Sequence, residues 1–280
     1  MEMRKQWLSA PYGLWAIVFS IAPIAIIAIY SFCSRSPYGN IIYEFTLENY
    51  QKFLQPIYLR VLWRSIILAV QSTLICFILG YPIAMMIAGS GSKQKNIMVM
   101  LFVLPLWTNF LLRTYAWMVL LRDQGVINQV LMALKIIDGP LKLLYNHNAV
   151  LLGMVYNFLP FMVLPIYSVL SKIDSSFIEA AEDLGATNFQ VFARVIFPLS
   201  LPGVISGLIM VFMPAVSTFV ISDLLGGGQT VLLGNLIQNQ FLVARNWQFG
   251  SAISMMMITL ILITMGLTAK YQREGGRQLW

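Results

Sequence analysis

Three carboxylates fall close together in the stretch SSFIEAAEDLG at residues 175–185, between two long apolar runs. Glu179, Glu182 and Asp183 are spaced i, i+3 and i+4, so a helix would carry them on one face, beside a neighbouring apolar face. Such a surface can dock a partner protein, or it can be an ordinary solvated loop. We favour docking, because the loop at 89–96 shows that a plain connection in this chain can be much shorter.

Helix start and stop signals occur twice around these acids. An S-x-x-E box at 176–179 predicts a helix that begins at Phe177 and ends at Gly185, a residue that readily adopts the left-handed conformation after a helix. A following T-x-x-Q box predicts a second helix, which runs until Pro198 interrupts it. We therefore expect an elbow at 175–198 that consists of a helix, a glycine corner and a second helix.

The rest of the chain is strongly apolar. Hydrophobic residues make up 59% of it and charged residues 10%, well below the quarter or so that is usual in soluble proteins. Runs of about 18 or more apolar residues can cross the hydrocarbon core as helices, which satisfy their own backbone hydrogen bonds in lipid. The sequence therefore predicts an all-α integral membrane protein with a single transmembrane domain over residues 1–280. Its six predicted spans are at about 12–32, 62–88, 97–121, 149–170, 199–222 and 249–269.

Basic residues indicate how these spans are oriented. With the N-terminus inside, nine Lys and Arg residues lie in the short cytoplasmic loops and tails, against six in the longer outer loops. This modest bias predicts a multi-pass protein whose two termini and elbow are all cytoplasmic.

Several kinds of chemistry have no basis in the sequence. There is no G-x-x-x-x-G-K-[ST] nucleotide loop, and the glycine-rich stretch at 225–234 lacks the lysine that such a loop needs. Cys33 and Cys76 have no C-x-x-C spacing, and His147 is the single histidine. The basic residues are scattered and form no stripe that would fit nucleic acid. We therefore expect a non-enzymatic chain with no catalytic residues and no metal site.

The elbow also carries a family pattern. EAAEDLG, followed after nine residues by VIFP, resembles the EAA loop of ABC importer permeases, whose pattern is E-A-A-x-x-x-G, nine residues, I-x-L-P. The matching residues are Glu179, Ala180, Ala181, Gly185 and Pro198. Val195 and Phe197 replace the Ile and Leu of the pattern and keep its apolar character. The resemblance implies a type I importer permease with six transmembrane helices, in which this loop is a coupling helix seated in a separate ATPase subunit. Glu179, Glu182 and Asp183 are then expected to hold the docking geometry.

Other stretches extend the resemblance. FTLENYQKFL at 45–54 is similar to the segment before the permease core of this family. The stretches at 104–117, 156–174 and 222–242 resemble the spermidine/putrescine importer permeases, and among these the B-type subunit. The resemblance implies a bacterial plasma-membrane complex with a second permease subunit, two ATPase subunits and an extracytoplasmic substrate-binding protein. It also implies transport by alternating access, with ATP and Mg²⁺ bound by the ATPases and no cofactor bound by this chain.

A path for polyamines would use acids and aromatic rings, since both stabilise an ammonium group. No acid lies well inside a predicted span. Asp223 is at the outer end of the fifth span, where it either attracts the cation or only marks the end of the helix. Trp107 lies deeper in its span than Trp117, whose position is typical of an interface anchor. Asn109 and Asn157 either line the path or bond a neighbouring helix. The residues expected along the path are Trp107, Asn109, Tyr115, Tyr156, Asn157 and Asp223.

Arg113 and a pair of glycines have other expected roles. A fixed positive charge would repel a cationic cargo, so we expect Arg113 to snorkel toward the outer surface or to help close a gate. Gly203 and Gly207 have G-x-x-x-G spacing, which suits close helix packing, here within the chain's own bundle rather than with the second permease.

Two alternatives remain at this point. The nearest is the same architecture with another cargo, such as iron, thiamine or an anion. An ion-coupled secondary transporter is the other, and it would carry ionisable groups near the membrane midplane, which this sequence lacks. Four prolines that interrupt predicted spans fit that alternative: Pro82, Pro105, Pro160 and Pro214.

Overall fold

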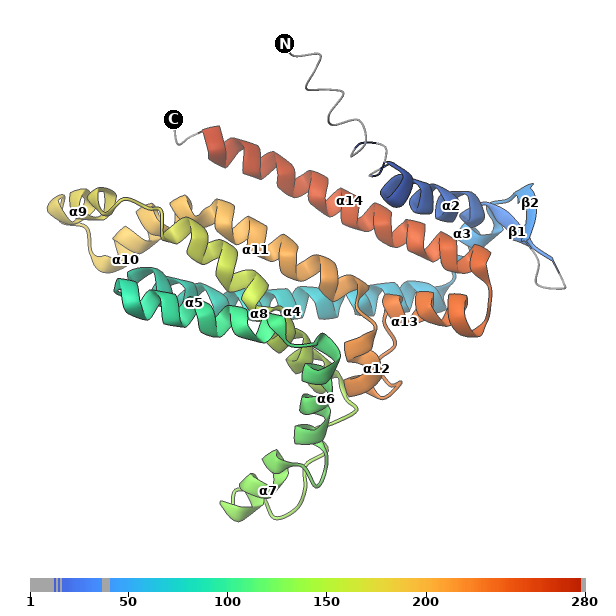
Figure 1. Ribbon diagram of the computed structural model, residues 1–280, viewed down its shortest axis with the longest axis horizontal. Helices are drawn as coiled ribbons and strands as arrows, with labels where there is room; N and C mark the ends of the chain where they lie inside the picture. Colours follow the sequence, from blue (N-terminus) through green and yellow to red (C-terminus); the bar gives the residue numbers. More distant parts are fainter. Residues whose placement is uncertain (1–12, 14, 16, 37–40, 278–280) are drawn as a thin grey trace, which may run out of the picture. The chain divides into compact units, whose positions relative to one another are not determined.

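The computed structural model describes residues 13, 15, 17–36 and 41–277, with side chains described as far as residue 266 (Figure 1). The described chain is mostly helical, and its strands β1 (Cys33–Arg35) and β2 (Ile41–Phe45) form a two-stranded antiparallel sheet. The chain divides into two compact units. One comprises Met1–Leu62 and Leu236–Leu260, and the other comprises Trp63–Asn235 and Ile261–Trp280.

The first unit is held together by polar and aromatic contacts around the hairpin. Its elements are η1 (Ile17–Ile21, a π-helix), α2 (Ala22–Ser31), β1, β2, α3 (Glu48–Phe53), the start of α4 (Pro56–Gly89), η3 (Asn239–Val243, a π-helix) and the start of α14 (Trp247–Arg277). Asn49 Nδ2 donates to the carbonyls of Ser31 and Cys33, at 3.2 and 3.0 Å. The Lys52 ammonium lies 4.7 Å from the centre of the Phe249 ring, a cation–π distance.

The second unit is a helical bundle built on α8 and α11. Its elements are the rest of α4, α5 (Ser92–Trp107), α6 (Phe110–Leu121), α7 (Val126–Ala133), α8 (His147–Leu170), α9 (Ser175–Asp183), α10 (Asn188–Val191), η2 (Phe192–Ile196, a π-helix), α11 (Phe197–Ser217), α12 (Val220–Gly226), the start of α13 (Leu233–Gln238) and the end of α14.

The two glycines at G-x-x-x-G spacing lie where α11 meets α8. A Cβ on Gly203 would fall 2.9 Å from the Pro165 carbonyl oxygen, and one on Gly207 would fall 2.8 Å from the Met162 sulfur. The absence of side chains therefore lets the two helices approach closely. The prediction that these glycines serve packing within the chain is confirmed.

In the described part of the chain, four helices are long and apolar enough to cross a membrane: Pro56–Gly89, His147–Leu170, Asn188–Ser217 and Trp247–Gly266. A broken pair, Ser92–Trp107 with Phe110–Ala133, passes the same test as a fifth. The helix at Ile17–Ser31 is shorter. The predicted first span, 12–32, lies partly outside the described residues.

The run predicted as a continuous span at 97–121 is divided into α5 and α6, which meet at a 94° bend (Figure 1). Pro105 lies in the last turn of α5 and cannot donate a backbone hydrogen bond there. Thr108 Oγ1 donates to the Pro105 carbonyl at 2.7 Å, and Asn109 Oδ1 accepts the Leu111 N–H at 2.8 Å. These side chains satisfy backbone groups that the break would otherwise leave without partners, so Thr108 and Asn109 are enough to connect the two helices.

Candidate functional site

The first helix of the elbow begins earlier than its sequence predicts. Asp174 is the N-cap of α9, and its Oδ1 accepts the Ser176 N–H at 3.0 Å. The predicted start at Phe177 is therefore wrong, because an acid lies just before the two serines and caps the helix instead. This backbone hydrogen bond, together with one from the Ser176 side chain, lowers the pKa of Asp174.

The glycine corner of the elbow is confirmed. Gly185 has φ +80°, its N–H donates to the Glu182 carbonyl at 2.8 Å, and the Ala186 N–H donates to the Ala181 carbonyl at 3.0 Å. This pair of bonds is the Schellman arrangement, in which the left-handed residue closes the last turn of a helix. The spacing between the E-A-A triplet and the glycine thus has a local structural reason.

The second half of the elbow agrees with its sequence at the start and differs at the end. Thr187 and Gln190 form the predicted capping box, with bonds of 3.4 and 2.9 Å. Pro198 does not end the helix, contrary to prediction: α10, η2 and α11 run on as one apolar stretch. In η2 the backbone bonds widen, as in Phe197 N–H to the Phe192 carbonyl, so the proline that follows is tolerated at the start of α11.

The surface of the elbow combines acids with exposed apolar side chains. No residue of α9 is buried, and Glu179, Glu182 and Asp183 are all exposed. Leu184 is 89% exposed and Phe189 76% exposed. Large apolar side chains left outside beside charges are typical of a surface that another protein covers.

The aromatic residues predicted for a cargo path lie at two places. Trp107 is 80% exposed at the end of α5, beside the break rather than within a span, and it lines a cavity of ≈ 330 Å³ together with Tyr167 of α8. Tyr156 of α8 meets Trp117 of α6 edge to face, with ring centroids 5.3 Å apart. Trp117 therefore has an aromatic partner in α8, which its sequence position did not predict. Tyr115 is half exposed on α6.

The two asparagines of the predicted path bond locally. Asn109 caps α6, as described above. Asn157 is buried, and its Nδ2 donates to the Gly153 carbonyl one turn earlier in α8, at 2.8 Å. Its Oδ1 is buried with no hydrogen-bond partner in the described chain. The amide of Asn157 therefore does not bond a neighbouring helix in this structure.

Asp223 belongs to a polar network where α11 gives way to α12. The run predicted as a span at 199–222 breaks at residues 218–219, so Asp223 lies in the first turn of α12. Its Oδ1 accepts a hydrogen bond from Asn235 Nδ2 of α13, at 2.5 Å. Sequence reasoning did not identify Asn235; the available signal was a lone amide in the otherwise apolar run LLGNLI.

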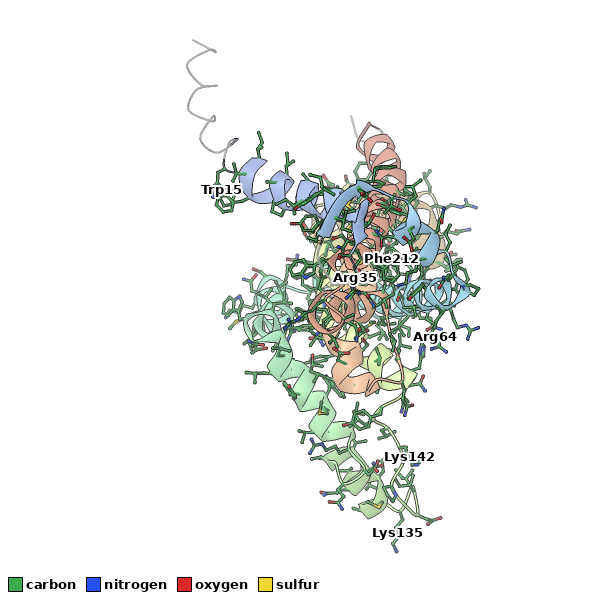
Figure 2. The ribbon with its side chains drawn as sticks, turned by 90° about the vertical axis from the view of Figure 1, so that its right-hand side faces the viewer. Trp15, Arg35, Arg64, Lys135, Lys142 and Phe212 are labelled. Carbon is green, nitrogen blue, oxygen red and sulfur yellow. The ribbon has the colours of Figure 1, made fainter. Side chains whose placement is uncertain are left out.

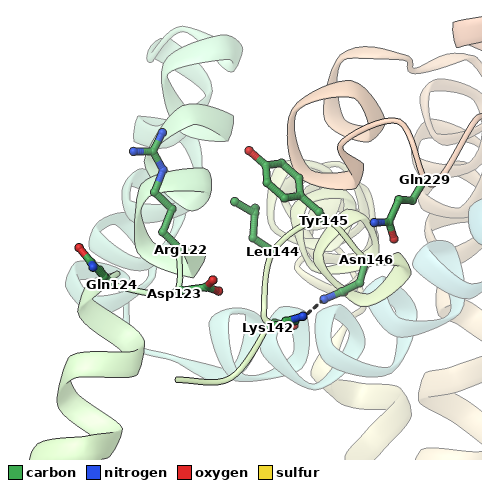
Figure 3. A pocket seen from close by; sticks show the side chains of 8 residues that line it. All are labelled: Arg122, Asp123, Gln124, Lys142, Leu144, Tyr145, Asn146 and Gln229. Carbon is green, nitrogen blue, oxygen red and sulfur yellow. Dashed lines mark hydrogen bonds between the residues drawn. The ribbon is translucent and has the colours of Figure 1, made fainter. Parts of the chain in front are cut away.

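A polar pocket lies beside this region (Figure 3). Its volume is ≈ 770 Å³, and its lining mixes charges of both signs. The lining residues are Arg122, Asp123, Gln124, Lys142, Leu144, Tyr145, Asn146 and Gln229. Asn146 donates to the Lys142 carbonyl at 3.0 Å and caps α8 through its Oδ1. Lys142 and Lys135 lie in the loop that follows α7 (Figure 2).

Arg113 of α6 is partly buried, and its Nε and Nη1 have no hydrogen-bond partner in the described chain. In the same described residues, no group of three or more His, Cys, Asp or Glu side chains is placed to hold a metal ion. The arrangement can thus dock a protein at the elbow and can offer an ammonium group a carboxylate and aromatic rings in the bundle.

Comparison with known proteins gives a family match. A family model described as binding-protein-dependent transport system inner membrane component matches residues 80–273. The spermidine/putrescine transport system permease protein PotB of Escherichia coli is 42% identical over 253 residues, which cover 90% of each chain. PotB of Haemophilus influenzae is 41% identical over 249 residues, which cover 89% of this chain and 87% of that protein.

A solved structure has a similar fold. A chain of a bacterial ABC transporter involved in the import of the acidic polysaccharide alginate superposes with a TM-score of 0.80 at 17% identity. The match covers 98% of this chain and 97% of the other.

Proposed function

Because the chain belongs to the family of binding-protein-dependent transport system inner membrane components, we propose that it is the permease subunit of an ATP-driven polyamine importer. The cargo would be spermidine and putrescine, moved into the cytoplasm. The observation that carries the proposal is the identity of 41–42% with two proteins named as spermidine/putrescine permeases, over about nine tenths of the chain.

The elbow is the proposed coupling site. Its exposed acids at Glu179, Glu182 and Asp183, with Leu184 and Phe189 beside them, suit a groove on an ATPase subunit that is basic at its rim and apolar at its base. Closure of the ATPases would then move α9, and α11 would carry that movement into the bundle, because η2 joins the elbow to α11 without a break.

The proposed complex contains this chain, a second permease subunit, two ATPase subunits and an extracytoplasmic substrate-binding protein. ATP and Mg²⁺ are bound by the ATPases, and this chain binds no cofactor. Six spans are proposed: the four long helices, the bent α5–α6 pair and the first apolar run at 12–32, with both termini cytoplasmic. Transport proceeds by alternating access, and the chain itself performs no catalysis.

Cargo contact is proposed at Asp223 and at the aromatic residues of α5, α6 and α8. A carboxylate and the faces of Trp107, Tyr115 and Tyr156 can replace water around an ammonium group, and the long spacing between amines in a polyamine suits separated contacts. Asn109 and Asn157 stay in the proposal as residues that shape the path through the local bonds described above.

A competition uptake assay tests the polyamine assignment. Cells or vesicles that contain the complete complex take up labelled spermidine, and unlabelled spermidine and putrescine should both reduce this uptake. Uptake of another labelled cargo that neither polyamine reduces would contradict the assignment.

One observation favours a second candidate, in which the same machine carries an anion. The guanidinium of Arg113 has two buried nitrogens with no partner in the described chain, and an anion would satisfy such a group. In that case Arg113→Gln should raise the KM for the cargo. For a polyamine the same substitution should leave KM unchanged or lower it.

A further inference from the structure

The junction of α11, α12 and α13 contains a buried amide with polar partners at both its oxygen and its nitrogen. Asn235 is 8% exposed. Its Oδ1 accepts the Leu232 N–H at 2.9 Å and faces Ser222 Oγ at 2.6 Å. Its Nδ2 donates to the Phe219 carbonyl at 3.1 Å and to Asp223 Oδ1 at 2.5 Å. The single Ser222 hydroxyl proton can also go to the Phe219 carbonyl, at 2.9 Å, so the bonds that fix the amide are those to Leu232, Phe219 and Asp223.

The orientation of the amide is set by its surroundings. The Leu232 N–H can only donate, and the Phe219 carbonyl can only accept, so a flipped amide would oppose like groups at both positions. The NH₂ group of Asn235 must therefore point at the Asp223 carboxylate. A hydrogen bond to an ionised acceptor is roughly twice as strong as one between neutral groups.

The backbone brings α13 to this place through a glycine. A Cβ on Gly234 would lie 2.5 Å from the Ser217 carbonyl oxygen and 2.9 Å from that of Thr218. The N–H of Leu233 also donates to the buried Ser65 Oγ of α4, at 2.7 Å. The two residues before Asn235 are thus held in place by contacts that do not involve Asp223.

Asp223 differs from its partners in exposure. Ser222 and Asn235 are buried, whereas Asp223 is exposed. Only its Oδ1 takes part in a hydrogen bond within the described residues. One carboxylate oxygen is therefore fixed to the bundle, and the other is available to a ligand outside it.

We infer that Asn235 is a positioning residue for cargo: it holds the Asp223 carboxylate so that the second oxygen receives a primary ammonium group of the polyamine. A carboxylate fixed in advance binds more tightly, because it loses less side-chain entropy when the cation arrives. Asn235 does not touch the cargo and acts through Asp223. The inference rests on the proposed function and names the residue pair that gives the permease its affinity for the polyamine.

A double-substitution cycle on the complete complex tests this inference by the KM for labelled spermidine. Asp223→Asn should raise KM about tenfold, since a charge-assisted contact is lost. Asn235→Ala should raise KM about threefold or more when Asp223 is present. In the Asp223→Asn background, Asn235→Ala should change KM less than about twofold, because the two residues act as one unit.

The matched control is Asn128→Ala. Asn128 is fully buried in α7 and makes three hydrogen bonds to backbone groups of Arg122 and Leu141, with no charged partner. Removing the Asn128 side chain should lower the amount of folded complex and leave the KM for spermidine unchanged. If Asn235→Ala behaves in the same way, with a lower amount of complex and an unchanged KM, the inference is overturned.

An exchanged pair covers the case in which Asn235→Ala does not assemble. Asn235→Asp alone places two carboxylates side by side, so it should reduce assembly. Combined with Asp223→Asn, it restores an amide–carboxylate bond with the roles reversed, but it leaves a carboxylate oxygen facing the Phe219 carbonyl. Assembly should therefore recover in part, to above that of Asn235→Asp alone, while KM stays as high as in Asp223→Asn. No recovery of assembly, or a normal KM, would contradict the inference. A wild-type complex that takes up no spermidine would instead overturn the proposed function, and this inference with it.

Discussion

The elbow at residues 175–198, capped by Asp174, and the junction at residues 217–235 both lie where long apolar helices are interrupted, yet they are stabilised in opposite ways. In the elbow the caps are local: Asp174 bonds Ser176, and Thr187 pairs with Gln190. In the junction the bonds from Asn235 to Ser222, Phe219 and Asp223 join groups 12 to 16 residues apart, and Asn235, which bonds the Asp223 carboxylate, is buried. A locally capped segment keeps its shape while its surface stays open to a partner. A segment fixed by distant buried groups instead holds one side chain at one place in the bundle.

The largest effect is expected from reversing a charge on the elbow. Glu179→Lys should abolish co-purification of the ATPase subunits and reduce uptake about tenfold or more, because a like charge facing a basic groove costs several kcal/mol. Glu44→Lys is the matched control, an exposed acid of β2 outside the elbow, and it should leave co-purification intact. Equal ATPase recovery with Glu179→Lys would show that the elbow is not the docking surface.

The next effect concerns the close approach at the junction. Gly234→Ala should destabilise the purified complex by about 1–3 kcal/mol, because the added methyl group meets backbone oxygens rather than a flexible side chain. Gly139→Ala, where nothing lies within 4 Å, should be neutral. Thermal unfolding of the two variants measures the difference. Equal unfolding midpoints would mean that the close contact between α13 and the end of α11 does not contribute to stability.

A smaller effect is expected at the corner of the elbow. Gly185→Ala places a side chain on a residue with φ +80°, which costs about 1–2 kcal/mol. It should reduce ATPase-driven uptake a few-fold without changing the KM for cargo. Gly185→Asn should be milder, since Asn tolerates the left-handed conformation. A raised KM in either variant would mean that the elbow and the cargo path are not separable.

The smallest effect is expected at the first cap of the elbow. The lowered pKa of Asp174 means that its ionised form stabilises α9 above the usual Asp pKa of about 3.9, and that this contribution is lost as pH falls through the lowered value. Asp174→Ala should therefore speed hydrogen exchange at the Ser176 amide at neutral pH, and the difference from wild type should vanish in acid. An unchanged exchange rate at neutral pH would show that the cap is dispensable.

The contrast between the two regions also explains what the sequence could predict. The apolar runs and the glycine corner could be read directly, because the signals for them lie within a few residues. The start of α9 was misplaced because three polar residues in a row compete for one cap. The continuation of the helix past Pro198 depends on the widened turn η2, and no residue type in the sequence predicts such a turn.

The junction was beyond sequence reasoning for a different reason. Asp223 could be singled out as an acid near the end of a span, but its partner Asn235 lies twelve residues away, and the two meet only because Gly234 lets α13 reach the break. Likewise, the contact between Trp117 and Tyr156 requires α6 and α8 to pack together. Long-range packing decides these positions, so residue type alone cannot predict them.

The most direct measurement is spermidine uptake into proteoliposomes that contain this chain with the second permease, the two ATPase subunits and the binding protein. Labelled spermidine should accumulate only with ATP and be competed by putrescine, and accumulation should fall about tenfold or more with Glu179→Lys. Accumulation without ATP, or ATP-dependent transport of another cargo that spermidine does not compete, would contradict the identification of this chain as a polyamine importer permease.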